Sequence, residues 1–189
     1  MQHTMIALVE NKPGVLNRVA SLFRRRNFNI ESLAVGRTED PEISRMTIVI
    51  DALPEDAARV EANLYKLVNM IDVQDITGQP VIARDLALIK VKAETKQRAE
   101  VSALAEIFRA RVVDVAPESL ILEITGTEDK IDSCLDVLRP FGIVEMVRTG
   151  EVSMARGSVG LPLTKGTGLG NGNGHSSSLS GEPLAATSL

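Results

Sequence analysis

The residues best suited to bind a ligand lie where a predicted strand passes into a predicted helix, at Asn11-Lys12-Pro13-Gly14. A helix N-terminus presents unpaired backbone N–H groups and the positive end of the helix dipole, and together these suit a carboxylate. Gly14 has no Cβ, so a ligand can approach the backbone closely. The alternative is a tight turn in which Gly14 supplies an unusual backbone conformation, and for an isolated loop of this kind a turn is the more frequent outcome. The loop therefore indicates an anion site or a simple turn.

Residues that support catalysis or metal binding are scarce. The chain has two histidines, His3 and His175, and one cysteine, Cys134. A zinc site needs more ligands than these at suitable spacing, and a Ser-His-Asp arrangement would have to use a histidine near a terminus. Cys134 shares helical spacing with apolar neighbours, which predicts a buried thiol, and a single cysteine forms no internal disulfide. We therefore expect no catalytic residue and no metal ligand in this chain.

The net charge and the hydropathy of the sequence argue against nucleic-acid partners and against a membrane span. The formal net charge is -4, which gives no field that would gather phosphate backbones, so we expect no nucleic-acid binding. No apolar run approaches the roughly 18 residues that a membrane span requires, and the N-terminus lacks a basic segment before an apolar stretch. A composition of 44% hydrophobic and 24% charged residues supplies enough apolar material for a core. A cytoplasmic globular protein is expected.

The first part of the chain reads as six elements. We predict strands at 4–10, 28–35, 46–51 and 71–76, a helix that follows Pro13, and a second helix that opens at Pro54. The apolar face of the first helix is predicted to contain Val15, Leu16, Val19, Ala20, Leu22 and Phe23, and that of the second Ala57, Val60, Leu64, Leu67 and Val68. The order βαββαβ is the ferredoxin-like arrangement.

The second part repeats this order. Strands are expected at 86–91, 112–115, 120–124 and 143–147, with helices around 101–108 and 131–138. Residues 20–26 resemble residues 105–111, which supports a duplication. The predicted fold class is thus α+β, with two ferredoxin-like domains at 1–78 and 85–157, a linker at 79–84 and a flexible Gly/Ser-rich tail at 158–189.

Three segments of the first domain, at 10–19, 28–33 and 44–48, resemble the ACT domain, an amino-acid-binding regulatory module. More narrowly, residues 26–33 together with Ser44-Arg45-Met46-Thr47 closely resemble the regulatory small subunits of acetolactate synthase (acetohydroxyacid synthase). The resemblance continues through 106–109 and 112–115, so it extends over both domains but not over the tail. It implies an N-terminal ACT domain followed by an ACT-like domain.

The resemblance also implies an effector site for valine that includes Asn11, Gly14, Val15, Asn29 and Ile30. Asn11 and Gly14 would form the loop that holds the effector, while Asn29 and Ile30 would approach it from the neighbouring subunit of a homodimer formed through ACT domains. The chemistry agrees, because a helix N-terminus accepts the carboxylate of an amino acid, amide oxygens accept from its ammonium group, and Ile30 offers apolar contact.

The implied function is that of a non-catalytic regulatory subunit. It would activate the catalytic large subunit of acetolactate synthase and confer feedback inhibition by valine in branched-chain amino-acid biosynthesis. Thiamine diphosphate, Mg²⁺ and FAD would belong to that partner, with no cofactor on this chain. The positions matched to the effector loop in the second domain, 96–99, contain no glycine, so that domain is expected to serve assembly or communication.

Two other functions fit the predicted fold. One is a free-standing ACT-domain sensor that acts on another enzyme or regulator, although the acidic charge and the lack of a helix-turn-helix region argue against direct DNA binding. The other is a small ferredoxin-like hydrolase such as an acylphosphatase, but Gly14 is not embedded in the loop pattern of that family.

Overall fold

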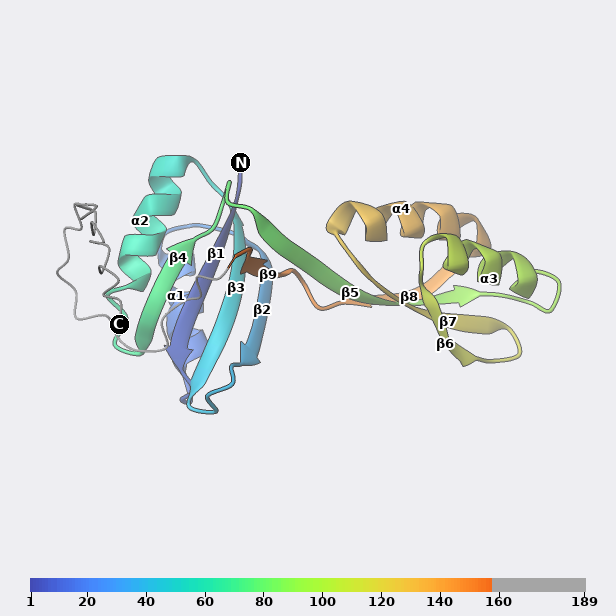
Figure 1. The fold of residues 1–189 in the computed structure, drawn as a ribbon, viewed down its shortest axis with the longest axis horizontal. Helices are drawn as coiled ribbons and strands as arrows, with labels where there is room; N and C mark the ends of the chain where they lie inside the picture. The colour runs from blue at the N-terminus through green and yellow to red at the C-terminus, as the bar shows by residue number, and fades with distance from the viewer. Residues whose placement is uncertain (158–189) are drawn as a thin grey trace, which may run out of the picture.

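The computed structural model describes residues 1–157, and the predicted tail at 158–189 lies outside the described residues. The first domain consists of β1 (Gln2–Glu10), α1 (Val15–Arg25), β2 (Ile30–Arg37), β3 (Ile43–Asp51), α2 (Pro54–Leu64) and β4 (Met70–Asp75). Its antiparallel sheet has the strand order β2-β3-β1-β4. Both helices cover one face of this sheet, which leaves the other face free for a further element (Figure 1).

The core of the first domain follows from strand alternation. Alternate residues of β1 and β3 face the helices and are buried, among them Met5, Ala7, Val9, Met46, Ile48 and Ile50. From α1 only Val15, Val19 and Phe23 are buried, because positions four apart lie along one line of a helix. The predicted apolar faces were too wide, since Leu16 is 46% exposed and Val68, beyond the end of α2, is 79% exposed.

The second domain repeats the arrangement with β5 (Val81–Lys92), α3 (Arg98–Ile107), β6 (Arg111–Val115), β7 (Ser119–Gly126), α4 (Glu128–Leu138), a 3-10 turn (Arg139–Phe141) and β8 (Ile143–Arg148). The strand order β6-β7-β5-β8 is equivalent to that of the first sheet. The predicted α+β fold with two ferredoxin-like domains is therefore confirmed. Cys134 lies in the second core, as expected, and its burial raises the pKa of the thiol.

The structural alignment of the two domains differs from the alignment that the sequence similarity suggested. Both α1 and α3 are followed by a residue in the left-handed conformation, Asn27 with φ of 58° and Arg109 with φ of 54°. Equating these residues places Phe23 opposite Ala105, whereas the sequence comparison had matched Phe23 with Phe108. The backbone bonds agree, since Phe28 N donates to Phe23 O and Ala110 N donates to Ala105 O. The segment equivalent to the effector loop is consequently 93–96, which also contains no glycine.

The domain junction contains a strand that the sequence analysis missed. The first four residues of β5, at 81–84, pair with β9 (Val152–Ala155), although a linker had been predicted at 79–84. This ribbon crosses the face of the first sheet that lies away from its helices (Figure 1). Arg45 Nη2 donates to the carbonyl of Ser153 at 2.7 Å, and Glu151 N donates to Ser32 Oγ at 2.9 Å. The second domain is thus tied to β2 and β3 of the first.

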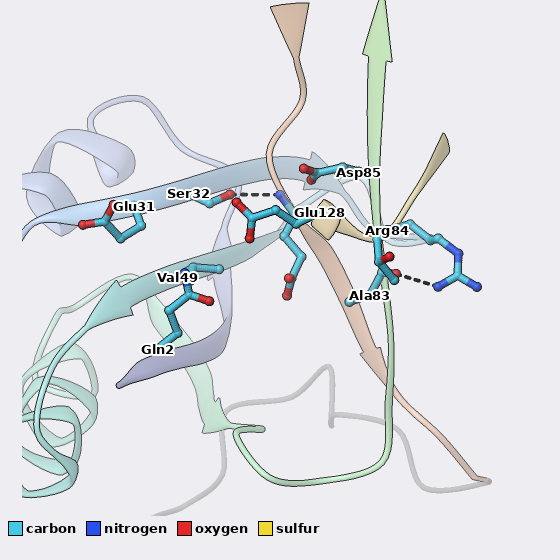
Figure 2. A pocket seen from close by; sticks show the side chains of 10 residues that line it. Gln2, Glu31, Ser32, Val49, Ala83, Arg84, Asp85 and Glu128 are labelled. Carbon is cyan, nitrogen blue, oxygen red and sulfur yellow. Dashed lines mark hydrogen bonds between the residues drawn. The ribbon is translucent and has the colours of Figure 1, made fainter. Parts of the chain in front are cut away.

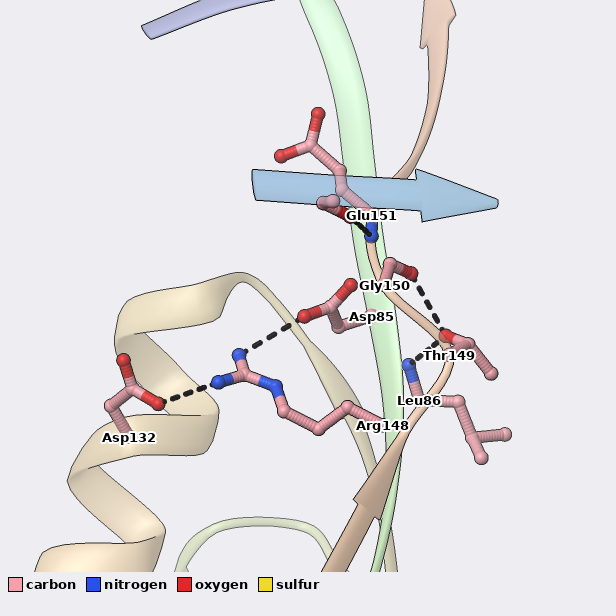
Figure 3. A network of polar contacts seen from close by, with 8 residues as sticks. Asp85, Leu86, Asp132, Arg148, Thr149, Gly150 and Glu151 are labelled. Atoms are coloured by element: carbon pink, nitrogen blue, oxygen red, sulfur yellow. Dashed lines mark hydrogen bonds and ion pairs between the residues drawn. The ribbon is translucent and has the colours of Figure 1, made fainter. Parts of the chain in front are cut away.

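Charged side chains fix the second domain beside this junction. Figure 3 shows Arg148 between Asp85 on β5 and Asp132 on α4. Arg148 Nη1 donates to Asp132 Oδ1 at 2.9 Å, and Arg148 Nη2 lies 3.0 Å from Asp85 Oδ2. Asp85 is buried with Arg148 only partly exposed, so this pair is better shielded from solvent than surface ion pairs. Removing Arg148 would leave the buried Asp85 carboxylate without its cation.

Gly150 makes the close approach between domains possible. Its φ is +79°, and a Cβ at this position would lie 2.6 Å from Ser32 Oγ. Gly78, which follows the equivalent strand of the first repeat, has φ of +76° and open space around it. We expect Gly78→Ala to cost about 1 kcal/mol from backbone strain alone, and Gly150→Ala to cost at least about 1 kcal/mol more, because Ser32 must shift as well. Urea unfolding of both variants measures the difference, and equal midpoints would contradict a tight domain contact.

Candidate effector site

The loop before α1 combines the two features that the sequence left as alternatives. Gly14 is the N-cap of α1 and is left-handed, with φ of 82° and ψ of -5°. A Cβ there would meet no atom within 4 Å, so the glycine is required for its conformation and not for space. The turn is therefore present. The helix N-terminus has no side-chain cap, as is also true of α2, α3 and α4, and the N–H of Val15 donates to Lys12 O, which leaves the N–H groups of Leu16 and Asn17 for a ligand.

The electrostatics of α1 differ from those of the other described helices. α2, α3 and α4 each carry acidic residues in the first turn, namely Glu55 and Asp56, Glu100, and Glu128 and Asp129. The first turn of α1 has none, while its last turn carries Arg24 and Arg25. Carboxylates at a helix N-terminus balance the helix dipole. The positive end of α1 is thus not balanced by its own side chains, and a ligand carboxylate would fill that role.

Asn11 is held in place by the loop between β2 and β3. Its backbone N donates to Glu42 O at 2.7 Å, and its Nδ2 donates to Pro41 O at 2.9 Å. Within residues 1–157 no donor bonds to Asn11 Oδ1, so this oxygen can accept from an ammonium group. Val15 is different, because its side chain is buried in the core and its N–H points to Lys12 O at 3.4 Å. Neither the side chain nor the N–H of Val15 is therefore free to bind a ligand.

A polar network that the sequence analysis missed anchors this end of α1. Asn69 Nδ2 donates to Glu10 Oε2 at 2.6 Å, and Asn69 Oδ1 accepts from Arg18 Nη1. Lys12 Nζ lies 3.1 Å from Glu10 Oε2. Lys12 thus pairs directly with the Glu10 carboxylate, whereas Arg18 is linked to it through Asn69, so this end of α1 holds two cations and one carboxylate, a balance that favours an anion. In the sequence, the one signal for this network is the position of Arg18, one helical turn beyond Gly14. No local pattern indicates Asn69.

Asn29 and Ile30 lie at the opposite end of α1. A helix of 11 residues is about 16 Å long. Asn29 Nδ2 donates to Glu31 Oε1 at 2.7 Å, and Ile30 packs partly against the core. Both line a shallow surface depression together with Phe23 and Phe28. One chain therefore presents the five predicted residues as two separate groups, one at each end of α1, and does not bring them into a single site.

Of the residues considered for catalysis, His3 has a structural partner, Cys134 is buried in the second core, and His175 lies outside the described residues. His3 is buried, with Nδ1 2.9 Å from Asp75 Oδ2. Burial acts to raise the pKa of Asp75, but hydrogen bonds from Thr77 and His3 outweigh burial and the pKa lies below its usual value. Residues 1–157 contain no group of three or more His, Cys, Asp or Glu side chains placed to hold a metal ion. Within the same residues, no helix is both long and apolar enough to cross a membrane.

Comparison with known proteins covers both domains. Residues 5–72 match the family described as the AHAS small subunit-like ACT domain, and residues 84–157 match the small subunit of acetolactate synthase. The acetolactate synthase small subunit of Mycobacterium leprae is 51% identical over 159 residues, which span 84% of this chain and 94% of that protein. The Mycobacterium bovis protein of the same name is 48% identical over 163 residues, or 86% and 97% of the two chains.

Comparison with solved structures indicates the same family. A crystal structure of the small subunit of acetolactate synthase from Thermotoga maritima superimposes with a TM-score of 0.79 at 38% identity, and the match covers 84% of this chain and 99% of that one. Identity of this level across both domains, together with the shared fold, shows that this chain belongs to the acetolactate synthase small-subunit family, the regulatory subunits of that enzyme with an ACT domain.

Proposed function

We propose that this chain is the regulatory subunit that activates the catalytic large subunit of acetolactate synthase and makes it subject to feedback inhibition by valine. The chain is non-catalytic in this proposal. Thiamine diphosphate, Mg²⁺ and FAD reside on the large subunit, where they supply the carbanion chemistry that pyruvate requires. The small subunit contributes binding and conformational free energy only.

The observation that carries the proposal is the open N-terminus of α1. Its left-handed Gly14, absent cap and absent acidic residues favour the carboxylate of an amino acid. Asn11 Oδ1 lies on the same loop and suits the ammonium group. The exposed side chain of Leu16 is next to the loop and provides apolar surface for an aliphatic side chain. These groups match the three parts of valine.

A homodimer explains the separation of the two residue groups. Because Asn29 and Ile30 lie a helix length from Asn11, they complete the proposed site only if they come from a second copy. Asn29 Nδ2 is already bonded to Glu31, so its Oδ1 remains for the ligand ammonium. A domain of this size is too thin to enclose a ligand alone, and a two-fold dimer would generate two equivalent sites.

Titration calorimetry with valine, leucine, isoleucine and alanine tests the site. Two extra carbons separate valine from alanine, worth about 1.6 kcal/mol if fully buried, or roughly tenfold in affinity. We expect one valine per chain and about tenfold weaker binding of alanine. Asn29→Ala should weaken valine binding as well. Unchanged valine affinity in that variant would contradict a contribution from the segment just before β2. Co-purification with mass spectrometry of the bound protein tests the large-subunit partner.

Removing residues 158–189 should leave folding and valine response unchanged. The match to the acetolactate synthase small subunit ends at residue 157, and the removed segment has no core-forming apolar periodicity. The full chain and the shortened chain should have thermal midpoints within about 1 °C and equal valine affinity. A large loss of the valine response after truncation would show that the tail takes part in regulation.

A further inference from the structure

Strand β6 is an open edge of the second sheet. The strand order β6-β7-β5-β8 places it at one end, and within residues 1–157 no strand pairs with its outer side (Figure 1). All five of its residues, Arg111–Val115, are exposed. An edge strand presents backbone N–H and C=O groups that can pair with another strand, and folded proteins usually cover or charge such an edge. The backbone of β6 is therefore available for strand addition.

The edge is apolar as well as open. Val112, Val113 and Val115 are 38%, 49% and 60% exposed, and Ile107 at the end of α3 is 73% exposed. The β7 partners of Val112 and Val115 belong to the core, so these two valines lie on the helix-covered face of the sheet, where α3 contacts β6. Exposed apolar side chains beside an unpaired strand edge are a surface that proteins commonly cover by association.

The equivalent edge of the first domain is different. β2 and β6 each contain a β-bulge at the same place of the repeat, with Glu31 and Val113 as the extra residues. The next residue of β2, Ser32, accepts a hydrogen bond from Glu151 N at the domain junction, as Figure 2 shows. The equivalent residue of β6, Asp114, forms no ion pair within residues 1–157. β2 is thus joined to the junction, whereas β6 keeps an apolar edge and an unpaired carboxylate.

The residues of β6 are complementary to a second copy of the same strand. The bulge places Arg111 and Asp114 on one face of the sheet, because their partners on β7 are two residues apart. In an antiparallel pair of β6 strands related by a two-fold axis, Arg111 can lie opposite Asp114 of the second copy, and the symmetry then repeats this contact. Val112 and Val113 face each other at the centre of the same register. One arrangement therefore matches both the charges and the apolar residues.

Arg111 can serve two carboxylates in this arrangement. It already donates to Glu123 Oε1 through Nε at 3.1 Å and through Nη2 at 2.5 Å. A guanidinium has five N–H donors, so Nη1 remains for a second carboxylate. The side chain of Arg111 is 77% exposed, which leaves it within reach of another chain. The ion pair with Glu123 fixes the guanidinium beside the open edge.

We propose that the second domains of two chains associate through antiparallel pairing of their β6 strands. The two sheets join into one, Arg111 of each chain pairs with Asp114 of the other, and the exposed valines are covered at the seam beside the two α3 helices. The contact lies outside the first domain. It therefore does not rest on the proposed effector site or on the dimer that completes that site.

Charge reversal tests the proposed register. Sedimentation equilibrium of the full chain without valine measures self-association. Arg111→Asp places two carboxylates opposite each other at both symmetric contacts, and Asp114→Arg does the same with two guanidinium groups. Like charges directly opposite each other destabilise a strand pair, so each variant should associate at least tenfold more weakly than the wild type.

Mixing the two variants provides the decisive measurement. A pair made of one Arg111→Asp chain and one Asp114→Arg chain has opposite charges at both contacts, so the mixture should regain association to within about threefold of the wild type. A structural defect in either variant would not be repaired by mixing. Arg139→Asp is the matched control, because Arg139 is also exposed and ion-paired within its chain, to Asp136, but precedes β8 at the other edge of the sheet. It should leave association unchanged, and circular dichroism verifies the fold of each variant.

Three results would overturn the proposal. Equal self-association of the wild type and both β6 variants would mean that β6 does not pair with a second copy. Weak association that persists in the mixture would mean that Arg111 and Asp114 do not face each other. Unchanged self-association together with weaker binding of the β6 variants to the large subunit would assign the edge to that partner.

Discussion

Gly14→Asp should abolish the response to valine while activation of the large subunit is largely retained. The new carboxylate would stand at the N-terminus of α1, where the ligand carboxylate is proposed to bind. Two like charges about 4 Å apart repel by about 4 kcal/mol at an effective dielectric constant of ~20, which is close to a thousandfold in affinity. Solvent screening reduces this value, so a loss of at least about 100-fold is expected. Titration calorimetry with valine measures it.

Gly14→Asn is the control that separates charge from backbone strain. Gly14 is left-handed, so any side chain there is strained, but Asn and Asp tolerate this conformation better than other residues do. Space does not limit either substitution, because no atom lies within 4 Å of the added Cβ. Both variants should lose similar stability, while the asparagine variant keeps valine affinity within about tenfold of the wild type. Equal loss of affinity in the two variants would contradict a carboxylate site at this helix terminus.

The sequence predicted best the elements whose apolar residues pack on a core. Strand β1 was evident as a run of consecutive apolar residues from Met5 to Val9, all of them buried, and helix α1 because its apolar residues recur at near four-residue spacing. Strand β9 was missed because its pattern is inverted: Val152 and Met154 are exposed, whereas Ser153 is buried. Its position depends on the long-range bond from Arg45 to the Ser153 carbonyl, and no local pattern reveals such a contact. Apolar periodicity finds strands that pack on a core and misses those held by polar contacts.

The candidate site was predictable in part. Gly14 after Pro13 indicated a helix start, and the left-handed turn follows from the glycine. The resemblance to ACT domains supplied Asn29 and Ile30, which composition and spacing would not have selected. Asn69 could not have been found, because it meets Glu10 across 59 positions of sequence through the packing of β4 beside β1.

The proposed regulation also has a thermodynamic consequence that can be measured without enzyme turnover. If valine opposes the activating arrangement of the two subunits, it does so through a coupling free energy, typically about 1 to 3 kcal/mol. Linkage is reciprocal, so binding of the large subunit must weaken valine binding by the same factor, about 5- to 150-fold. Valine titrations of the small subunit with and without saturating large subunit should give dissociation constants that differ by this factor.

Two controls make the coupling measurement decisive. The large subunit alone, titrated with valine, accounts for any valine that binds to that partner. The Gly14→Asp chain should associate with the large subunit with an affinity that valine does not change, because the effector site is blocked while the docking surface is intact. If the dissociation constants with and without partner are equal although valine strongly inhibits the complex, valine does not act through differential binding. Inhibition would then reside in a kinetic step, since reciprocity constrains binding free energies and leaves rate constants free.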